Sequence, residues 1–225
     1  MLELTHVTKL YHEGQPNEVA AVRDVSLCLP LGKVTVLEGP SGSGKTSLLT
    51  LMGCLARPTS GRVVLQGEVL SGLPEQHLAQ VRRKTFGFAF QRFNLLPGMN
   101  VLTNVMLPAY PLGLPYAELV ARAQAVLVQL GIAHRAAFPV ELLSGGEMQR
   151  TAIARALVND PAIVIADEPT ANLDAALTAQ FLDIVAALKA GGKSVILSSH
   201  DPRITRASVV DRVVAMADGC LVAAP

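Results

Sequence analysis

The sequence predicts an α/β fold with a mostly parallel central sheet, an antiparallel sheet beside it and an inserted group of helices. Three features support this fold class. Short apolar runs are typical of strands buried on both faces, apolar residues partly alternate near the N-terminus, and a glycine-rich turn separates a strand from a helix. At 225 residues the chain suits one large domain, or a core with a subdomain.

The first 29 residues predict two antiparallel strands. Apolar side chains partly alternate from Leu2 to the Val7 region and again over 19–29, and residues 14–17 supply the connecting loop. Tyr11 closes the first strand. Its ring could stack on a nucleotide base, although ordinary packing is the simpler explanation when Tyr11 is considered alone.

The phosphate-binding pattern G-x-x-x-x-G-K-[ST] occurs at 39–46, between a strand at 34–37 and a helix at 46–52. Its glycines allow backbone N–H groups to face an anion, and the helix N-terminus adds partial positive charge. Lys45 can reach the terminal phosphates, and the Thr46 hydroxyl can ligate Mg²⁺. The alternative is a turn that binds nothing, which the flanking strand and helix disfavour. The candidate phosphate-contacting residues are Gly39, Pro40, Ser41, Gly42, Ser43, Gly44, Lys45, Thr46 and Ser47.

Four of the six phenylalanines lie within 86–93, and their alternation over 86–90 predicts a strand. Gln91 ends that strand, where its polar side chain could face the nucleotide. The apolar loop at 93–97 has two explanations that the sequence does not separate. It forms a surface for a partner, or it covers the local core.

A helical subdomain is predicted at roughly 95–160, because helical spacing recurs at 101–106 and 116–130. Its last helix begins at Ser144, which can form a capping box with Glu147. The simple explanation is a well-capped helix. Two glycines in its first turn nevertheless lower its stability, by roughly 1 kcal/mol each in a helix interior and less at an end. They fit the close approach of another backbone or of an anion to Ser144, Gly145 and Gly146.

A buried strand over 162–166 ends in the carboxylates Asp167 and Glu168. Ligands of parallel sheets bind at the carboxyl ends of strands, and two carboxylates beside a core strand are costly unless a cation or a function holds them. Asp167 can hold Mg²⁺, and Glu168 can polarise water for attack on a γ-phosphate. His200 follows another buried strand, 194–198. A lone histidine is usually structural, but this position allows a γ-phosphate contact.

Composition limits the classes of function. The 19 basic and 18 acidic residues give a net charge of +1, which offers no dedicated nucleic-acid surface. No apolar run approaches the length of a membrane span, and the N-terminus lacks the pattern of a signal peptide. The three cysteines fit neither a metal site nor a disulfide framework, so we expect buried thiols in a reducing cytoplasm: Cys28, Cys54 and Cys220.

Taken together, the motifs resemble those of ABC-type ATPase subunits over essentially the whole chain. Residues 39–46 resemble Walker A, 143–150 the ABC signature, and 163–168 Walker B with its adjoining glutamate. The other matches are Tyr11 with the adenine-stacking aromatic, Gln91 with the Q-loop, 171–174 (ending in Asp174) with the D-loop, and His200 with the switch histidine.

Within that family, the segments 93–97, 104–108 and 167–174 look most like the macrolide-exporter and lipoprotein-releasing ATPases. The resemblance implies one ABC ATPase domain over 1–225, with a P-loop NTPase core that binds ATP and Mg²⁺. It assigns catalysis to Lys45, Gln91, Glu168 and His200, the metal to Thr46, Gln91 and Asp167, and further nucleotide contacts to Tyr11, Asp174 and Ser144–Gly146.

The resemblance also implies an assembly. Two copies form a head-to-tail homodimer with ATP at the interface, and each site takes Ser144, Gly145 and Gly146 from the other subunit. A transmembrane permease on a separate chain receives the work, so the ATPase lies at the cytoplasmic face of the inner membrane. The complex would export a substrate or release lipoproteins or lipids, with no direct nucleic-acid contact.

Two other functions are compatible with the same motifs. One is an ATPase that drives a membrane protein to regulate an extracytoplasmic process without transporting anything. The other is an ABC ATPase that acts on DNA or ribosomes. That class usually carries coiled-coil insertions or two ATPase cassettes, which the sequence lacks, and the charge balance also disfavours it.

Overall fold

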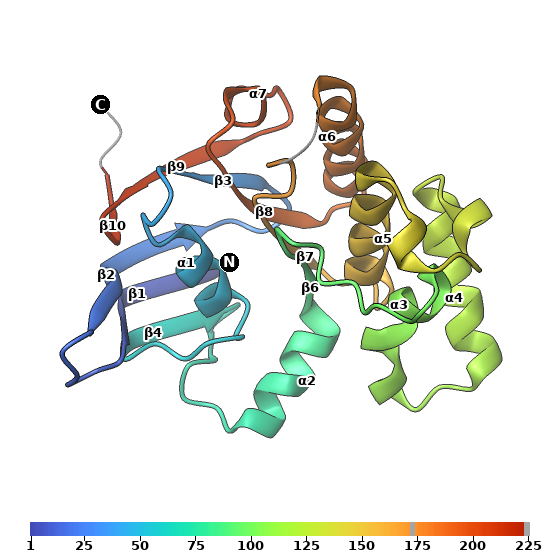
Figure 1. The fold of residues 1–225 in the computed structure, drawn as a ribbon. Coiled ribbons are helices and arrows are strands. Elements are labelled where there is room, and N and C mark those ends of the chain that lie inside the picture. Colours follow the sequence, from blue (N-terminus) through green and yellow to red (C-terminus); the bar gives the residue numbers. More distant parts are fainter. Residues whose placement is uncertain (172–173, 223–225) are drawn as a thin grey trace.

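The computed structural model describes residues 1–171 and 174–222. Figure 1 shows two sheets with helix α1 (Lys45–Met52) between them, and a separate group of helices beside the larger sheet. The predicted α/β class, with one mostly parallel and one antiparallel sheet, is confirmed.

Within the described residues, the larger sheet has six strands in the order β10-β9-β3-β8-β7-β6, and only β10 runs antiparallel to its neighbour. The short apolar runs form its central strands, which are almost entirely buried because helices or the other sheet cover both faces. The strands are β3 (Val34–Glu38), β6 (Phe86–Ala89), β7 (Ile163–Asp167), β8 (Ser194–Ser199), β9 (Arg212–Ala217) and β10 (Cys220–Leu221).

The smaller sheet is antiparallel, with the order β2-β1-β4-β5. The two strands predicted at the N-terminus form its β1–β2 pair. Leu2, Leu4 and Val7 of β1 face the core, and residues between them point to solvent or are half-buried. The strands are β1 (Leu2–Tyr11), β2 (Val19–Leu29), β4 (Ser60–Leu65) and β5 (Glu68–Val69).

Helices lie in sequence between β6 and β7, where the helical insertion was predicted. Pro115 and Pro139 each precede a helical turn as its N-cap residue. Asp174 caps α6 (Ala175–Ala190), which follows β7, by accepting the Leu177 N–H at 2.8 Å. The helices besides α1 are α2 (Glu75–Thr85), α3 (Val101–Met106), η1 (Leu107–Leu112), α4 (Tyr116–Gln129), η2 (Ala133–Arg135), η3 (Val140–Leu142), α5 (Gly145–Leu157), α6 (Ala175–Ala190) and α7 (Pro202–Thr205).

Two apolar clusters hold the larger sheet. One fills the space between the two sheets around α1, where Leu48 and Met52 are fully buried. The other joins the opposite face of the sheet to α3–α6, through residues such as Leu127, Val164 and Val185. The sheet is therefore fixed from both sides, and the loops at its carboxyl edge stand on a rigid support.

Two predictions about local structure were wrong. The strand predicted to reach Gln91 ends at Ala89, whose partner is Ala166 at the end of the β6–β7 pairing, so Gln91 lies in the following loop. Of the three cysteines only Cys54 is buried. Cys28 alternates outward on β2 and Cys220 lies on the short β10, so both are exposed.

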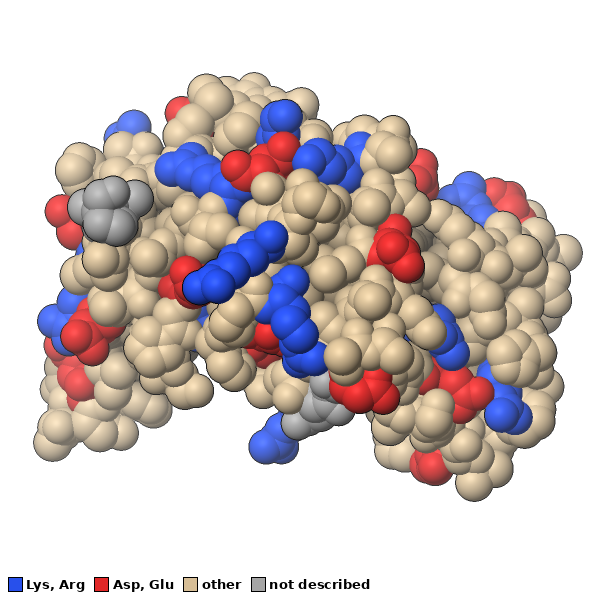
Figure 2. Space-filling model, turned by 90° about the horizontal axis from the view of Figure 1, so that it is seen from above, with Lys and Arg blue, Asp and Glu red and all other residues tan. Residues whose placement is uncertain are grey.

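The surface carries interspersed charges. On the face shown in Figure 2, Lys and Arg side chains lie among Asp and Glu, as the near-neutral composition predicts. Within the two described ranges, no helix is both long and apolar enough to cross a bilayer.

Candidate active site

Four candidate segments meet at one edge of the larger sheet. Because β3, β6, β7 and β8 are parallel, their carboxyl ends lie together. The phosphate loop follows β3, Gln91 follows β6, Glu168 follows β7 and His200 follows β8. They surround a cavity of about 480 Å³ lined by Val19, Ala20, Ala21, Arg23, Ser41, Gly42, Ser43, Gly44, Lys45, Thr46, Ser47, Gln91, Glu168, His200, Asp218 and Gly219.

The phosphate loop packs tightly against the smaller sheet. Gly44 has φ +99°, and a Cβ there would lie 2.2 Å from the Ala21 carbonyl oxygen, so only glycine fits. The Gly219 N–H donates to the Ser43 carbonyl at 3.1 Å. Lys45 Nζ donates to the Gly39 carbonyl at 2.7 Å, which fixes the amine within the loop.

The loop is suited to an anion. Ser43 is only 3% exposed, yet its Oγ has no hydrogen-bond partner among the described residues. The first N–H groups of α1, from Lys45 onward, have no carbonyl partner within the helix either. Since buried polar groups in proteins are normally paired, this concentration of donors beside a buried ammonium fits nucleotide phosphates.

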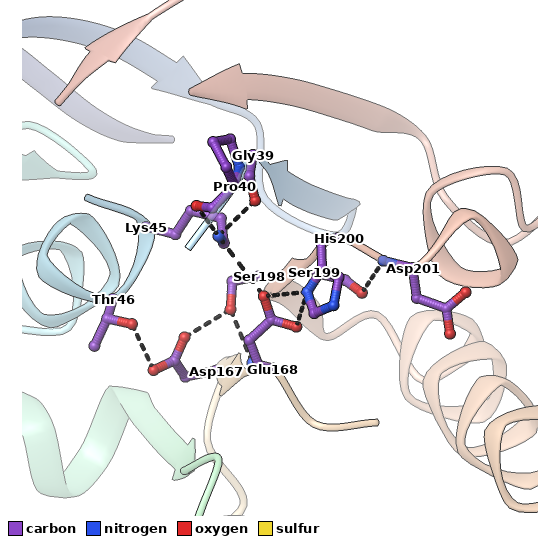
Figure 3. Close-up of polar contacts among 10 residues, drawn as sticks. All are labelled: Gly39, Pro40, Lys45, Thr46, Asp167, Glu168, Ser198, Ser199, His200 and Asp201. Atoms are coloured by element: carbon purple, nitrogen blue, oxygen red, sulfur yellow. Dashed lines mark hydrogen bonds and ion pairs between the residues drawn. The ribbon is translucent and has the colours of Figure 1, made fainter. Parts of the chain in front are cut away.

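Oxygen ligands gather beside the loop. Thr46 Oγ1 donates to Asp167 Oδ2 at 2.8 Å, and Ser198 Oγ donates to Asp167 Oδ1 at 2.6 Å (Figure 3). Hydroxyl and carboxylate oxygens are the donors that Mg²⁺ prefers, so Thr46 and Asp167 fit the predicted metal. Gln91 lines the cavity but forms no hydrogen bond with Thr46 or Asp167 among the described residues.

The Glu168 carboxylate points at the cavity from an unusual backbone conformation. Its φ is +43°, and its N–H donates to Ser198 Oγ at 2.8 Å. Its Oε1 lies 3.0 Å from His200 Nδ1 and 3.7 Å from Lys45 Nζ. A non-glycine residue in this region is strained, and such strain concentrates at functional sites. The Glu168 side chain is 13% exposed, so its partners orient it with little competition from solvent.

Sequence reasoning missed Ser198, which is fully buried and links the two carboxylate residues. The signal that could have found it is register, since Ser198 pairs with Asp167 across the β7–β8 ladder. It also missed the part of the cavity wall that β2 and the β9–β10 turn form beside the phosphate loop, because no spacing pattern marks it. That wall includes Arg23 and Asp218.

Other candidate residues lie away from this cavity. Tyr11 is 40% exposed, with Lys9 Nζ 5.2 Å from its ring centroid, and does not line the cavity. Asp174, Ser144 and Gly145 are exposed and do not line it either. The predicted D-loop residues Asn172 and Leu173 fall outside the described residues.

The predicted capping box at the start of α5 is confirmed. The Glu147 N–H donates to Ser144 Oγ, and the Ser144 N–H donates to Glu147 Oε2 at 2.8 Å. Arg135 Nε donates to Glu147 Oε1 at 2.7 Å. The Ser144 N–H and then the Arg135 guanidinium lower the pKa of Glu147 to about 2.

We expect Glu147→Gln to lower the free energy of unfolding by roughly 1–2 kcal/mol at pH 7, because charge-assisted hydrogen bonds weaken. The folded pKa of Glu147 lies below its ordinary value of 4.5, so this contribution is fully present above about pH 5 and disappears as the pH falls toward 2. Urea unfolding of both proteins at several pH values checks this. Glu118→Gln, at an exposed ion pair on α4, should change stability little at any pH. A pH-independent difference for Glu147→Gln would contradict the expectation.

Comparison with known proteins agrees with this geometry. Residues 22–171 match the ABC transporter family. The chain is 41% identical over 99% of its length to a macrolide export ATP-binding/permease protein, MacB, of Hyphomonas neptunium, but spans only about a third (34%) of that relative. It is 43% identical over 89% of its length to an uncharacterised ABC transporter ATP-binding protein of Thermotoga maritima, and covers 86% of that protein.

Solved structures give the same result. The bacterial ABC transporter cassette MJ0796, solved as a dimer, superposes with a TM-score of 0.91 at 35% identity, covering 99% of this chain and 97% of the other. A post-hydrolysis dimer of that cassette with ADP and Pi gives 0.90. The chain therefore belongs to the ABC transporter family, and its fold is that of an ATP-binding cassette.

Proposed function

We propose that this chain binds ATP–Mg²⁺, hydrolyses it to ADP and phosphate, and thereby drives a membrane permease. The observation that supports this most directly is that four candidate side chains line one cavity and that Asp167 is hydrogen-bonded to one of them, Thr46. The four are Lys45, Thr46, Glu168 and His200. A phosphate loop by itself would support nucleotide binding only. The added carboxylate and imidazole also support hydrolysis.

In this proposal each group acts on the terminal phosphate or the attacking water. Glu168 accepts a proton from the water as general base, and His200, 3.0 Å from its carboxylate, orients it and contacts the γ-phosphate. Lys45 and the loop N–H groups stabilise charge on the phosphate oxygens. Thr46 and Asp167 hold Mg²⁺, which neutralises phosphate charge when bound. Gln91 senses the nucleotide from the cavity rim.

We also propose the head-to-tail dimer. Ser144 and Gly145 are exposed at the N-terminus of α5, away from the chain's own cavity. A Cβ on Gly146 would lie 2.7 Å from a Leu177 methyl, so a larger residue there would have to displace that side chain. A Cβ on Gly145 would meet no described atom within 4 Å. A second glycine without an internal reason fits the approach of ATP bound to another subunit.

A groove next to the cavity fits the membrane partner. It has a volume of about 460 Å³ and lies between α2, β6, η1 and α5, with Phe88, Phe90, Pro108 and Pro111 among its lining residues. Leu96, in the apolar loop beside it, is 43% exposed, whereas Leu95 packs on the helical core. In this proposal the exposed part of the loop meets the permease, while Leu95 covers the local core. We place the permease on a separate chain that exports a substrate or releases lipoproteins or lipids, with this chain on the cytoplasmic face of the inner membrane.

We expect Thr46→Ala to lower phosphate release by at least about tenfold and to raise the Mg²⁺ concentration needed for half-maximal activity, because the hydroxyl that faces Asp167 is lost. Thr46→Ser keeps that hydroxyl and should stay within about threefold of the unmodified chain. Phosphate release by the purified full chain, titrated with Mg²⁺ and stopped with EDTA, checks both. Release that is unaffected by EDTA, or equal in the two variants, would refute the metal site.

A further inference from the structure

The loop that follows Gln91 is held in an unusual conformation. Phe93 and Asn94 both have left-handed backbone angles, with φ +57° and +49°. For two consecutive non-glycine residues this conformation is costly and persists only where surrounding contacts impose it. The cause of the conformation should therefore be visible in the contacts of this loop.

One side chain holds both strained residues. The Arg155 guanidinium donates from Nη1 to the Asn94 carbonyl at 2.6 Å and from Nη2 to the Phe93 carbonyl. Arg155 is half-buried on α5, and burial lowers its pKa below the ordinary value. Among the described residues no carboxylate lies within ion-pair distance of it, so the two loop carbonyls are its polar partners.

The next part of the loop is fixed from a second helix. Asn104 of α3 is fully buried, and its side chain accepts from the Leu96 N–H at 2.7 Å and donates to the Leu96 carbonyl at 3.1 Å. Gln91 and Arg92 are thus a short exposed link between β6 and a clamped segment. The Phe93 N–H also donates to the Phe90 carbonyl at 2.9 Å, which closes a turn around Gln91, so a shift of α5 that carries Arg155 would pull on that turn.

The same helix carries the exposed Ser144 and Gly145 at its other end. Ser144 caps α5 and Arg155 lies in its last turn, about 16 Å away at 1.5 Å per residue. Nine residues of this helix are buried, so we expect it to respond to a displacement as one rigid element: Gly146, Glu147, Gln149, Thr151, Ala152, Ile153, Ala154, Ala156 and Leu157.

We propose that Arg155 is a positioning residue, which ties the Gln91 loop to α5 so that Gln91 and the Ser144 end of the helix move together. Arg155 touches neither substrate nor metal and acts through Gln91. The expected effect of Arg155 on ATP hydrolysis rests on the proposed function of the chain. Within one chain, α5 and Arg155 would then connect the proposed nucleotide cavity at Gln91 with the surface at Ser144 that is proposed to contact the other subunit.

The test combines a double-mutant cycle with a structural readout. Arg155→Met keeps the apolar stem but removes both donors. We expect kcat for ATP to fall about tenfold with KM changed less than about twofold, and Arg155→Lys to recover part of the loss. In a Gln91→Ala background, adding Arg155→Met should lower kcat by a further factor of less than about two. Both substitutions act through Gln91, so their effects on kcat should not multiply.

Arg212→Met is the control. Arg212 also donates to a backbone carbonyl, that of Cys28 at 2.8 Å, and it lines neither the cavity nor the groove beside the loop. It should leave kcat within about twofold in both backgrounds. Its thermal unfolding shows how much of any effect is general destabilisation.

Amide hydrogen exchange of the full chain tests the proposal independently of ATP hydrolysis. Arg155→Met should raise deuterium uptake in peptides covering 90–96 and leave those covering 39–52 unchanged. Unchanged deuterium uptake at 90–96 would overturn the role of Arg155. So would a double variant in which the separate effects of Arg155→Met and Gln91→Ala on kcat multiply. An unmodified chain that releases no phosphate would instead refute the proposed function, and the exchange result would still stand.

Discussion

Glu168→Gln is expected to lower the rate of ATP hydrolysis by about 10²–10⁴-fold while the affinity for ATP stays within about threefold. Glutamine has nearly the same shape, so it can keep a hydrogen bond to His200, 3.0 Å away. It cannot accept a proton from water. The loss therefore falls on kcat, because the phosphate loop and Lys45 still bind the nucleotide.

Single-turnover phosphate release and titration with a fluorescent ATP analogue measure the two quantities separately. Glu118→Gln is a suitable control, since it neutralises an exposed carboxylate of α4 that pairs with Arg122 far along the chain from the site. Near-normal turnover by Glu168→Gln would remove the general base from the proposed mechanism. A parallel loss of affinity would instead show that the carboxylate mainly supports the loop around Lys45.

Ser144→Arg is expected to abolish the ATP-driven dimer and, with it, more than about 90% of turnover, while the monomer still binds ATP. Ser144 is exposed at the start of α5, outside the chain's own cavity. A bulky side chain there would block the proposed contact with another subunit. The sharpest comparison is Glu168→Gln against the double variant Glu168→Gln/Ser144→Arg, with and without ATP–Mg²⁺, by size-exclusion chromatography with light scattering.

The Ser144 substitution also removes a helix cap, at a cost of about 1 kcal/mol. Asn100→Ala is matched to this loss, because Asn100 caps α3 by accepting the Thr103 N–H at 2.8 Å. It should show a similar decrease in stability and normal dimerisation. A dimer that persists in the double variant would mean that Ser144–Gly146 do not face ATP across an interface.

The sequence was most informative where local chemistry and backbone geometry coincide. The phosphate loop, the capping box at Ser144 and the strand ending in Asp167 each combine a residue pattern with the element that needs it. Because parallel strands end at one edge, placing those patterns after strands was enough to predict that Glu168 and His200 would meet the loop.

The remaining features depend on contacts between segments far apart in sequence. Arg23 and Asp218 reach the cavity only because β2 and the β9–β10 turn pack on the phosphate loop. The exposure of Cys28 follows from which face of β2 covers the core, a choice that a single cysteine does not reveal. The clamp by Arg155 joins residues 61 and 62 positions apart, beyond the reach of any periodicity.

The packing of the phosphate loop also limits how this fold can be divided. The Arg23 N–H donates to the Gly219 carbonyl, the Gly219 N–H donates to the Ser43 carbonyl, and Gly44 touches Ala21. A segment near each terminus of the described chain thus buttresses the loop between them. The antiparallel sheet is consequently not a detachable module. Insertions should be tolerated in connections that lie away from these contacts. A truncated chain that lacks either the first thirty residues or the final hairpin should lose the support of the phosphate loop.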